Sequence, residues 1–155
     1  MTHQTLIGIL GCPIRYNGKA AVEYFLTQRY APKNPAYHLK WQLAGGGLEF
    51  GETPQQALVR EFQEELNVVP EIIYPYPLVR SVLRNYPRRQ LHLVLLSYIV
   101  SIGSQIPINT DPDHETADMG WFTFDQIQKL DNIENNLYFI NQITDIINQE
   151  KLIKA

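Results

Sequence analysis

The sequence predicts a mixed α/β or α+β domain, with helices packed in layers against a sheet. Short runs rich in Ile, Leu, Val, Tyr and Phe, bounded by Pro, Asn or Gly, indicate strands on both sides of one central helix. A second helical pattern closes the chain, and this order of elements is typical of layered domains. The 155 residues and the 45% apolar content suit one core, so we expect residues 1–155 to form a single domain.

Two apolar segments near the N-terminus, residues 6–12 and 20–27, predict a strand pair. Pro13 and the Asn17-Gly18 pair lie between them, and Asn-Gly is a strong hairpin signal. We therefore expect an antiparallel hairpin at the start of the domain.

A loop and a glycine run follow this hairpin. Residues 30–35 contain two prolines and an asparagine, which favour a loop, and residues 39–43 alternate weakly between apolar and polar side chains. The chain then continues into Gly45, Gly46 and Gly47, where we expect a turn that shapes the mouth of a site.

The second half of the chain predicts two strands, a long loop and a helix. Residues 78–83 and 91–100 are apolar segments, and the Asn-Tyr-Pro-Arg sequence between them favours a turn. Residues 101–116 are polar and contain two prolines, so we expect a long loop before the short apolar run at 119–124. Residues 137–152 repeat Leu and Ile at near-helical spacing, which predicts an amphipathic helix that packs through its isoleucines.

Composition and charge argue against several classes of protein. The net charge of −3 provides no basic field for holding a phosphate backbone, so we expect no nucleic-acid partner. The single Cys12 cannot form an internal disulfide, and no Cys or His spacing matches a zinc site. No segment resembles a membrane span or a secretion signal. These features predict a cytoplasmic protein without a membrane partner.

The central helix is predicted by the residues at its start. Thr53 suits the N-cap, Pro54 the first turn, and Gln56 the third helical position of a capping box. At about 100° per residue, the apolar side chains group on one side of the helix and three carboxylates share another arc. The apolar side contains Leu58, Val59, Phe62 and Leu66, and the carboxylates are Glu61, Glu64 and Glu65.

Three carboxylates on one helical face repel one another. A hard divalent cation such as Mg²⁺ or Mn²⁺ prefers oxygen ligands and would offset this repulsion, while sharing its remaining positions with water and phosphate oxygens. The alternative is a solvated acidic face, which is common on surface helices.

The wider sequence around this helix favours the metal site. Gly46 is followed after five residues by Glu52, and after seven more by Arg60-Glu61-Phe62-Gln63-Glu64-Glu65-Leu66-Asn67-Val68. This string resembles the Nudix box, G-x5-E-x7-R-E-U-x-E-E-x-G-U, in which U is a bulky apolar residue. Only Asn67 differs, and asparagine, like the glycine it replaces, adopts the left-handed conformation that ends a helix. The strand order and the later segment around Trp121 are similar to the family as well.

The resemblance implies a Nudix-type α/β/α sandwich with a mixed sheet and a loop–helix–loop catalytic element. It implies that Arg60 orients the glutamates by ion pairing, that Glu52 is an accessory carboxylate, and that Gly46 keeps side chains away from the phosphates. It also assigns the Mg²⁺ or Mn²⁺ ions to four ligands, which are Glu61, Glu64, Glu65 and the backbone carbonyl of Gly45.

The implied reaction is metal-assisted attack of water on a phosphoanhydride, in line and without a covalent intermediate. A carboxylate takes the proton of the water, and family members use either a glutamate of the box or one from a later loop. Glu64 is therefore the first candidate for the general base and Glu115 the second. Glu115 is equally explained as an exposed acidic residue of the loop.

The substrate is predicted from weaker features. The triple glycine is similar to Nudix nucleoside triphosphatases, which favours cleavage of a (deoxy)nucleoside triphosphate to monophosphate and pyrophosphate. Tyr86 lies 18 residues after Val68, near a substrate-binding tyrosine of the dinucleoside polyphosphate hydrolases, so that activity stays open. ADP-ribose or nucleotide-sugar hydrolysis is a further alternative, although Leu83 and Arg84 stand where ADP-ribose hydrolases carry a proline. Arg29 is a candidate for phosphate binding, or a surface arginine.

A different class of function is a non-catalytic domain that binds nucleotides. Relatives of that kind usually lose carboxylates of the box, whereas this chain keeps Glu52, Glu61, Glu64 and Glu65. The resemblance therefore favours a hydrolase that acts on a small nucleotide. The sequence leaves open whether the protein is a monomer or a homodimer.

Overall fold

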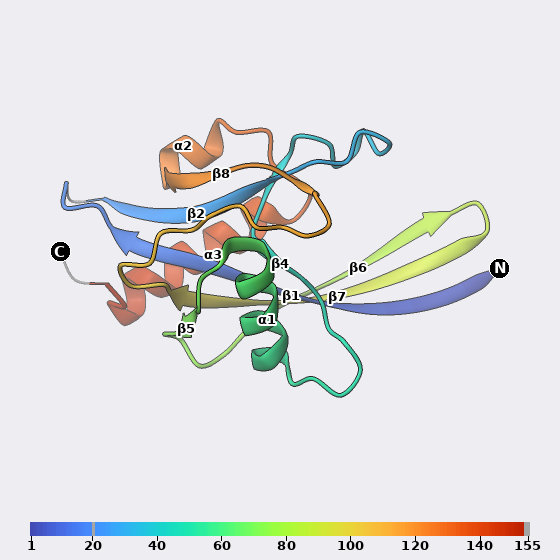
Figure 1. Ribbon diagram of the computed structural model, residues 1–155, viewed down its shortest axis with the longest axis horizontal. Helices are drawn as coiled ribbons and strands as arrows, with labels where there is room; N and C mark the ends of the chain where they lie inside the picture. The colour runs from blue at the N-terminus through green and yellow to red at the C-terminus, as the bar shows by residue number, and fades with distance from the viewer. Residues whose placement is uncertain (20, 154–155) are drawn as a thin grey trace.

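A mixed sheet between helices forms the body of the protein (Figure 1). The computed structural model describes residues 1–19 and 21–153. Helix α1 (Pro54–Leu66) packs on one face of the sheet, and α2 (Phe124–Gln128) and α3 (Asn136–Glu150) pack on the other. The predicted α/β/α sandwich is therefore confirmed.

Within the described residues, eight strands make up the sheet, and β1 is at its centre. The strands are β1 (Thr2–Tyr16), β2 (Val22–Arg29), β3 (Trp41–Gln42), β4 (Ala44–Gly47), β5 (Glu71–Ile72), β6 (Leu78–Tyr86), β7 (Arg89–Ser101) and β8 (Thr116–Thr123). Strand β1 runs antiparallel to β2 and β4 and parallel to β7, which makes the sheet mixed. Strands β5 and β6 pair with β7, while β3 and β8 pair with β2.

The predicted N-terminal hairpin is confirmed where β1 meets β2, with Ile14 opposite Tyr24. Strand β1 is longer than the predicted residues 6–12 because it pairs along most of its length with β7, a partner distant in sequence. The expected start of the second strand at residue 20 lies outside the described residues, and β2 begins at Val22.

The prediction of a turn at Gly45–Gly47 is wrong, because these residues belong to β4. In this strand Gly45 pairs with Leu10 of β1. The φ angle of Gly45 is 140°, and a Cβ atom here would overlap the carbonyl oxygen of Ile9. Glycine therefore serves to bring β4 close to β1 rather than to reverse the chain.

The second half of the chain follows the prediction more closely. Strands β6 and β7 form the expected hairpin, which extends with the first half of β1 as an arm away from the body (Figure 1). Residues 102–115 form the expected long loop, and β8 leads directly into the short helix α2. Helix α3 buries Ile140, Ile143 and Ile147, as the isoleucine pattern predicted.

Two apolar clusters hold the helices to the sheet. Helix α1 contributes Ala57, Leu58, Phe62 and Leu66 to the first, and α3 packs with Cys12, Trp41 and Leu43 in the second. Each large side chain that is fully buried contributes about 1.5–3 kcal/mol of transfer free energy, so these contacts fix α1 on the sheet. No helix of the described residues is both long and apolar enough to cross a membrane.

Candidate active site

Helix α1 begins and ends as its sequence predicts. The hydroxyl of Thr53 accepts a hydrogen bond from the Gln56 backbone N–H at 3.2 Å, and the Gln56 side chain accepts one from the Thr53 N–H at 2.9 Å. Pro54 occupies the first turn, and Asn67 ends the helix with a left-handed φ of 54°. These local contacts fix the position of every carboxylate on the helix.

Arg60 connects α1 to the loop that precedes it. Its guanidinium binds the Glu52 carboxylate through two nitrogens, at 2.5 and 3.0 Å, and donates to the Gly47 carbonyl at 3.0 Å. A third nitrogen donates to Glu61 at 2.9 Å and lies 3.5 Å from Glu64. The hydrogen bond from Arg60 lowers the pKa of Glu52, and the bond to Glu52 raises the pKa of Arg60. Arg60 thus contacts the carboxylates of Glu52, Glu61 and Glu64 at the same time.

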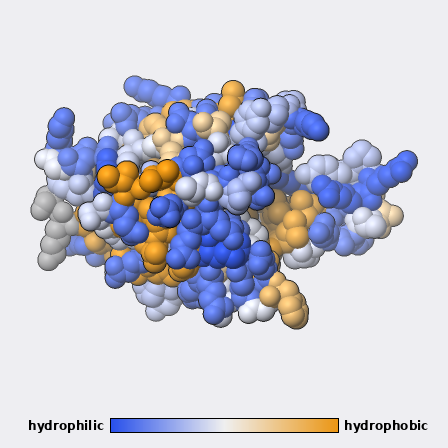
Figure 2. Space-filling model, viewed as in Figure 1, coloured by the Kyte–Doolittle hydropathy of each residue, from blue (hydrophilic) through white to orange (hydrophobic). Residues whose placement is uncertain are grey.

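Glu61 and Glu65 lie under strand β4, while Glu64 is on the open side of the helix with 47% of its side chain exposed. A Cβ atom at Gly46 would overlap the Glu61 carboxylate, so glycine is required for this contact. The Gly45 backbone lies close enough to the Glu65 carboxyl to lower its pKa. Figure 2 shows a mainly hydrophilic surface over α1.

Burial changes the titration of two of these carboxyls. It raises the pKa of Glu61, although the hydrogen bond from Arg60 opposes the shift. The pKa of Glu65 is raised to about 8, mainly by burial and also by the nearby charges of Glu61 and Asp111. The negative charges of these carboxylates therefore lie close together, and the neighbouring arginines offset their repulsion only in part.

The donor set fits a hard divalent cation. It consists of carboxylate and carbonyl oxygens, and the repulsion between Glu61 and Glu65 is the kind that a cation relieves. Within residues 1–19 and 21–153, no three acidic, histidine or cysteine side chains already surround one point as metal ligands. The carboxylates of Glu61 and Glu64 instead point to the guanidinium of Arg60.

A second wall of the site contains Arg29 and Glu115. Arg29, at the end of β2, forms an ion pair with Glu115 at 3.1 Å, so the structure brings these two candidates together. Arg29 also lowers the pKa of Glu65, which means that its charge acts on the carboxylates of α1. Both members of the pair are partly exposed.

Asp111, which the sequence did not single out as a site residue, is a buried carboxylate that organises the loop carrying Glu115. Its oxygens accept hydrogen bonds from the backbone N–H groups of Asp113 and Glu115, at 2.9 and 2.8 Å, and from the Thr116 hydroxyl at 3.1 Å. The signal was present in the Asp-Pro-Asp sequence, because an aspartate in such a segment often binds the backbone two residues on.

The same loop is fixed to the C-terminal end of α1. The backbone N–H groups of Ile108 and Thr110 donate to the carbonyls of Leu66 and Glu65, both at 2.9 Å, and the Thr110 hydroxyl donates to the Glu64 carbonyl at 2.9 Å. Carbonyls at the end of a helix lack partners within the helix, so the loop supplies them. Helix and loop therefore form one unit around the carboxylates.

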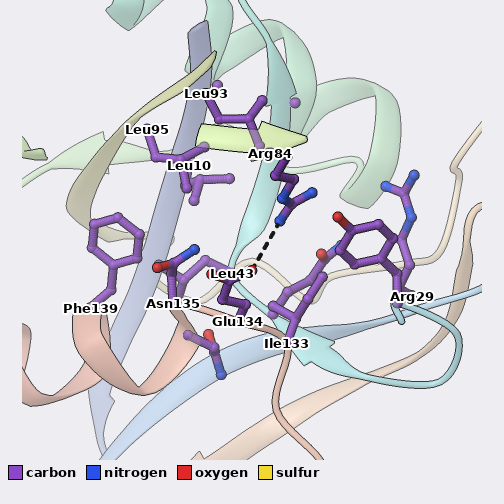
Figure 3. Close-up of a pocket in the computed structure, with 16 residues that line it drawn as sticks. Leu10, Arg29, Leu43, Arg84, Leu93, Leu95, Ile133, Glu134, Asn135 and Phe139 are labelled. Atoms are coloured by element: carbon purple, nitrogen blue, oxygen red, sulfur yellow. Dashed lines mark ion pairs between the residues drawn. The ribbon is translucent and has the colours of Figure 1, made fainter. Parts of the chain in front are cut away.

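A cavity of about 260 Å³ adjoins β4 (Figure 3). Gly45 and Gly46 line it, and the same two residues contact Glu65 and Glu61. Arg29 is at one side of the cavity and Phe139 at the other. The remaining wall is partly apolar, through Leu10, Leu43, Leu93, Leu95 and Ile133, and partly polar, through Arg84, Glu134, Asn135 and Asn136.

Tyr86 lies outside the residues that line this cavity. It is near the tip of the arm, two residues beyond Arg84 on β6, with the Arg89 guanidinium 4.7 Å from its ring centre. Arg84 and Tyr37 line the cavity instead, and the Arg84 guanidinium lies 4.6 Å from the centre of the Tyr37 ring.

The box and the fold around it match a known family. The sequence pattern of the NUDIX domain matches residues 9–143 of this chain. The chain belongs to the Nudix family. Nudix hydrolases act on phosphoanhydride bonds and generally need divalent metal ions.

Individual relatives agree with this assignment. The chain is 37% identical over 78 residues to the 8-oxo-dGTP diphosphatase of Escherichia coli (strain K12), a match that spans 50% of this chain and 55% of that enzyme. It is 28% identical over 123 residues to the nucleoside triphosphatase NudI of Enterobacter sp. (strain 638), which spans 77% of this chain and 84% of NudI. The crystal structure of the MutT NUDIX hydrolase from Burkholderia pseudomallei matches with a TM-score of 0.59 at 26% identity, over 79% of this chain and 86% of that one.

Proposed function

We propose that this Nudix hydrolase cleaves a (deoxy)nucleoside triphosphate to the monophosphate and pyrophosphate. The observation that carries the proposal is the double role of β4, whose Gly45 and Gly46 line the cavity and also contact the glutamates of α1. A nucleoside in the cavity would have its phosphates beside Glu61 and Glu65. The relatives named as diphosphatase and triphosphatase support the same substrate class.

The residues have separate roles in this reaction. Glu61, Glu64, Glu65 and the Gly45 carbonyl would hold Mg²⁺ or Mn²⁺, which when bound neutralises phosphate charge and lowers the pKa of water. Arg60 keeps Glu61 and Glu52 in place through the hydrogen bonds described above. Glu64 takes the proton of the attacking water at its exposed carboxylate, and the bond between phosphorus and the leaving pyrophosphate oxygen breaks in line.

Arg29 and Glu115 complete the site on the side of the loop. The Arg29 guanidinium borders both the cavity and the carboxylates, and its planar fork suits phosphate oxygens. Its ion pair with Glu115 holds it there before substrate binds. Glu115 remains the second candidate for the general base.

The test is a panel of nucleotides with Mg²⁺ or Mn²⁺, with products separated by chromatography. The panel contains dNTPs, NTPs, dinucleoside polyphosphates, ADP-ribose and nucleotide sugars. We expect triphosphates to be preferred, giving monophosphate and pyrophosphate. Preferred cleavage of dinucleoside polyphosphates or ADP-ribose would overturn the substrate assignment, and no turnover with either metal would favour a nucleotide-binding domain.

The variant Glu64→Gln tests the assignment of the base. Loss of a general base typically reduces turnover by about 10²–10⁴-fold, and the exposed position of Glu64 predicts an unchanged fold. Glu150→Gln, at an exposed site on α3, is the matched control and should keep full activity. Near-normal turnover of Glu64→Gln would transfer the role to Glu115, which Glu115→Gln then tests.

A further inference from the structure

One face of the arm is apolar and exposed. The arm consists of residues 2–7 of β1 and of the hairpin formed by β6 and the first part of β7. Val79 and Leu83 of β6 are 54% and 59% exposed, and Ile7 of β1 is 38% exposed. The strand register places these three side chains on one face of the sheet, because residues two apart point to the same side. Figure 2 shows hydrophobic atoms where the arm leaves the body, and apolar areas of this kind often mark a contact surface.

This face continues the one that α1 covers in the body. Ile9 of β1 pairs with Leu96 of β7, and both belong to the apolar cluster that holds α1. Val79 pairs with the same Leu96 from the other side. The apolar face of the arm is therefore the uncovered end of a face that is buried elsewhere in the sheet.

The polar side chains of the arm leave this face free of charge. The Ser81 hydroxyl lies 2.6 Å from Nε2 of His92 on the neighbouring strand, so the two side chains satisfy one another. Arg80 and Arg84 point to the opposite face, where their guanidinium groups lie 3.9 and 4.6 Å from the centres of two tyrosine rings. A partner can therefore bury the apolar face without burying an arginine.

The ring of Phe50 is a protruding apolar group on the same side of the sheet. It is fully exposed in the loop between β4 and α1. This loop starts beside the arm, because the Leu48 backbone N–H donates to the Ile7 carbonyl at 2.9 Å. Two copies related by a two-fold axis need one surface that carries both halves of a contact. Phe50 and the apolar face of the arm meet this condition.

The charges of the two regions are complementary. Residues 72–110, which include β6 and β7, contain four arginines and no acidic residue. Residues 48–66, which include the loop of Phe50 and α1, contain five glutamates and one arginine. The arm of one copy is therefore attracted to the loop and helix of another.

Pairing of two arms through the outer edge of β6 is less favourable. Two β6 strands that pair antiparallel about Val82 would set Arg80 of one copy opposite Arg84 of the second copy, and like charges in such a pair are destabilising. The face of the arm has no such conflict.

We propose that the apolar face of the arm is the contact surface for a second copy of this chain, with Phe50 of each copy packed on Ile7, Val79 and Leu83 of the other. The proposal goes beyond the nucleotide substrate, because none of these four residues lines the cavity. Its test needs no catalysis, so it stands or fails separately from the proposed function.

Sedimentation velocity of the full chain tests the association. We expect a species of twice the 17.9 kDa chain mass that dissociates on dilution. Added NaCl should weaken the association, because it screens the arginines and glutamates. A monomer at every concentration up to about 100 μM would overturn the proposal and leave the surface to a different partner. An association that NaCl does not weaken would contradict the charge pairing.

The variant Leu83→Ser removes an exposed apolar side chain from the arm. We expect the dissociation constant of the dimer to rise at least about tenfold, since burial of a leucine contributes this much. Circular dichroism should be unchanged, because the side chain is exposed in the single chain. Ile106→Ser makes the same kind of change at an exposed site in the 102–115 loop and should leave the dimer intact. If Leu83→Ser stays dimeric, or if Ile106→Ser dissociates equally, the interface lies elsewhere.

Mixing two variants tests whether Phe50 contacts the arm. Phe50→Ser and Leu83→Ser should each weaken the dimer, because either change damages both copies of the contact. A mixed pair keeps one intact contact, between Phe50 of the Leu83→Ser chain and the arm of the Phe50→Ser chain. We therefore expect the mixture to associate more strongly than either variant alone. A mixture no more dimeric than its components would show that Phe50 and the arm do not meet, which would overturn the proposed contact.

Discussion

Glu65 combines burial with several nearby charges. Its carboxyl lies beside β4, and its pKa is raised to about 8, mainly by burial and also by the charges of Glu61 and Asp111. The Gly45 backbone and the charge of Arg29 only partly oppose this shift. In the metal-free protein at neutral pH, the folded state therefore holds a proton here that the unfolded chain, with an ordinary glutamate pKa near 4.5, has released.

This difference predicts how the metal-free protein responds to pH. The folded state binds the extra proton between pH 4.5 and about 8, so the contribution of Glu65 to stability falls as the pH rises through this window. Glu65→Gln removes the ionisable group, and we expect it to raise the free energy of unfolding at pH 8 by roughly 1–3 kcal/mol, with little effect near pH 4.5. Urea unfolding in EDTA at the two pH values measures this.

The comparison needs a control for other groups that titrate. Glu150→Gln removes an exposed carboxyl on α3 and should leave the pH dependence of stability unchanged. If Glu65→Gln and wild type lose stability in parallel between pH 4.5 and 8, the Glu65 carboxyl does not hold the proton.

At the scale of the element, α1 and β4 show what local sequence can predict. The N-cap Thr53, the left-handed Asn67 and the arc of carboxylates were all evident in the sequence, because helix signals lie within a few residues of one another. Strand β4 was predicted as a turn, because its glycines have no apolar alternation. Its pairing of Gly45 with Leu10 joins residues far apart in the chain, and no local pattern encodes that contact.

Strand β4 offers a matched pair of substitutions. A Cβ atom at Gly46 would overlap the Glu61 carboxylate, whereas a Cβ atom at Gly47 meets nothing within 4 Å. We expect Gly46→Ala to displace Glu61 and reduce kcat/KM for the preferred nucleotide about 100-fold, since small misplacements of catalytic groups cost this much. Gly47→Ala should stay within about threefold of wild type. Steady-state kinetics of both variants measure the difference, and equal activities would show that Glu61 needs no contact with β4.

At the scale of the whole molecule, the site forms where distant segments meet. The Nudix box could be found by spacing alone, so the grouping of Arg60 and the glutamates on one helix was predictable. The Arg29–Glu115 pair and the cavity with Asn135 depend instead on how β2, the 102–115 loop and α3 pack around β4. These residues are separated by many tens of positions, and only the folded chain brings them together.

The buried carboxylate of Asp111 fixes the conformation of the loop that carries Glu115. Asp111→Asn keeps the shape of the side chain, but one of its two oxygens becomes an NH₂ group that cannot accept from Asp113, Glu115 or Thr116. We expect a loss of about 1–3 kcal/mol in the free energy of unfolding, faster hydrogen exchange at the Glu115 amide, and reduced kcat because Glu115 and Arg29 lose their fixed position. Urea unfolding and amide exchange measure the first two effects.

Asp113→Asn changes an exposed residue of the same loop and should leave all three quantities unchanged. Wild-type exchange at Glu115 in the Asp111→Asn variant would mean that the loop is held by its contacts with α1 alone.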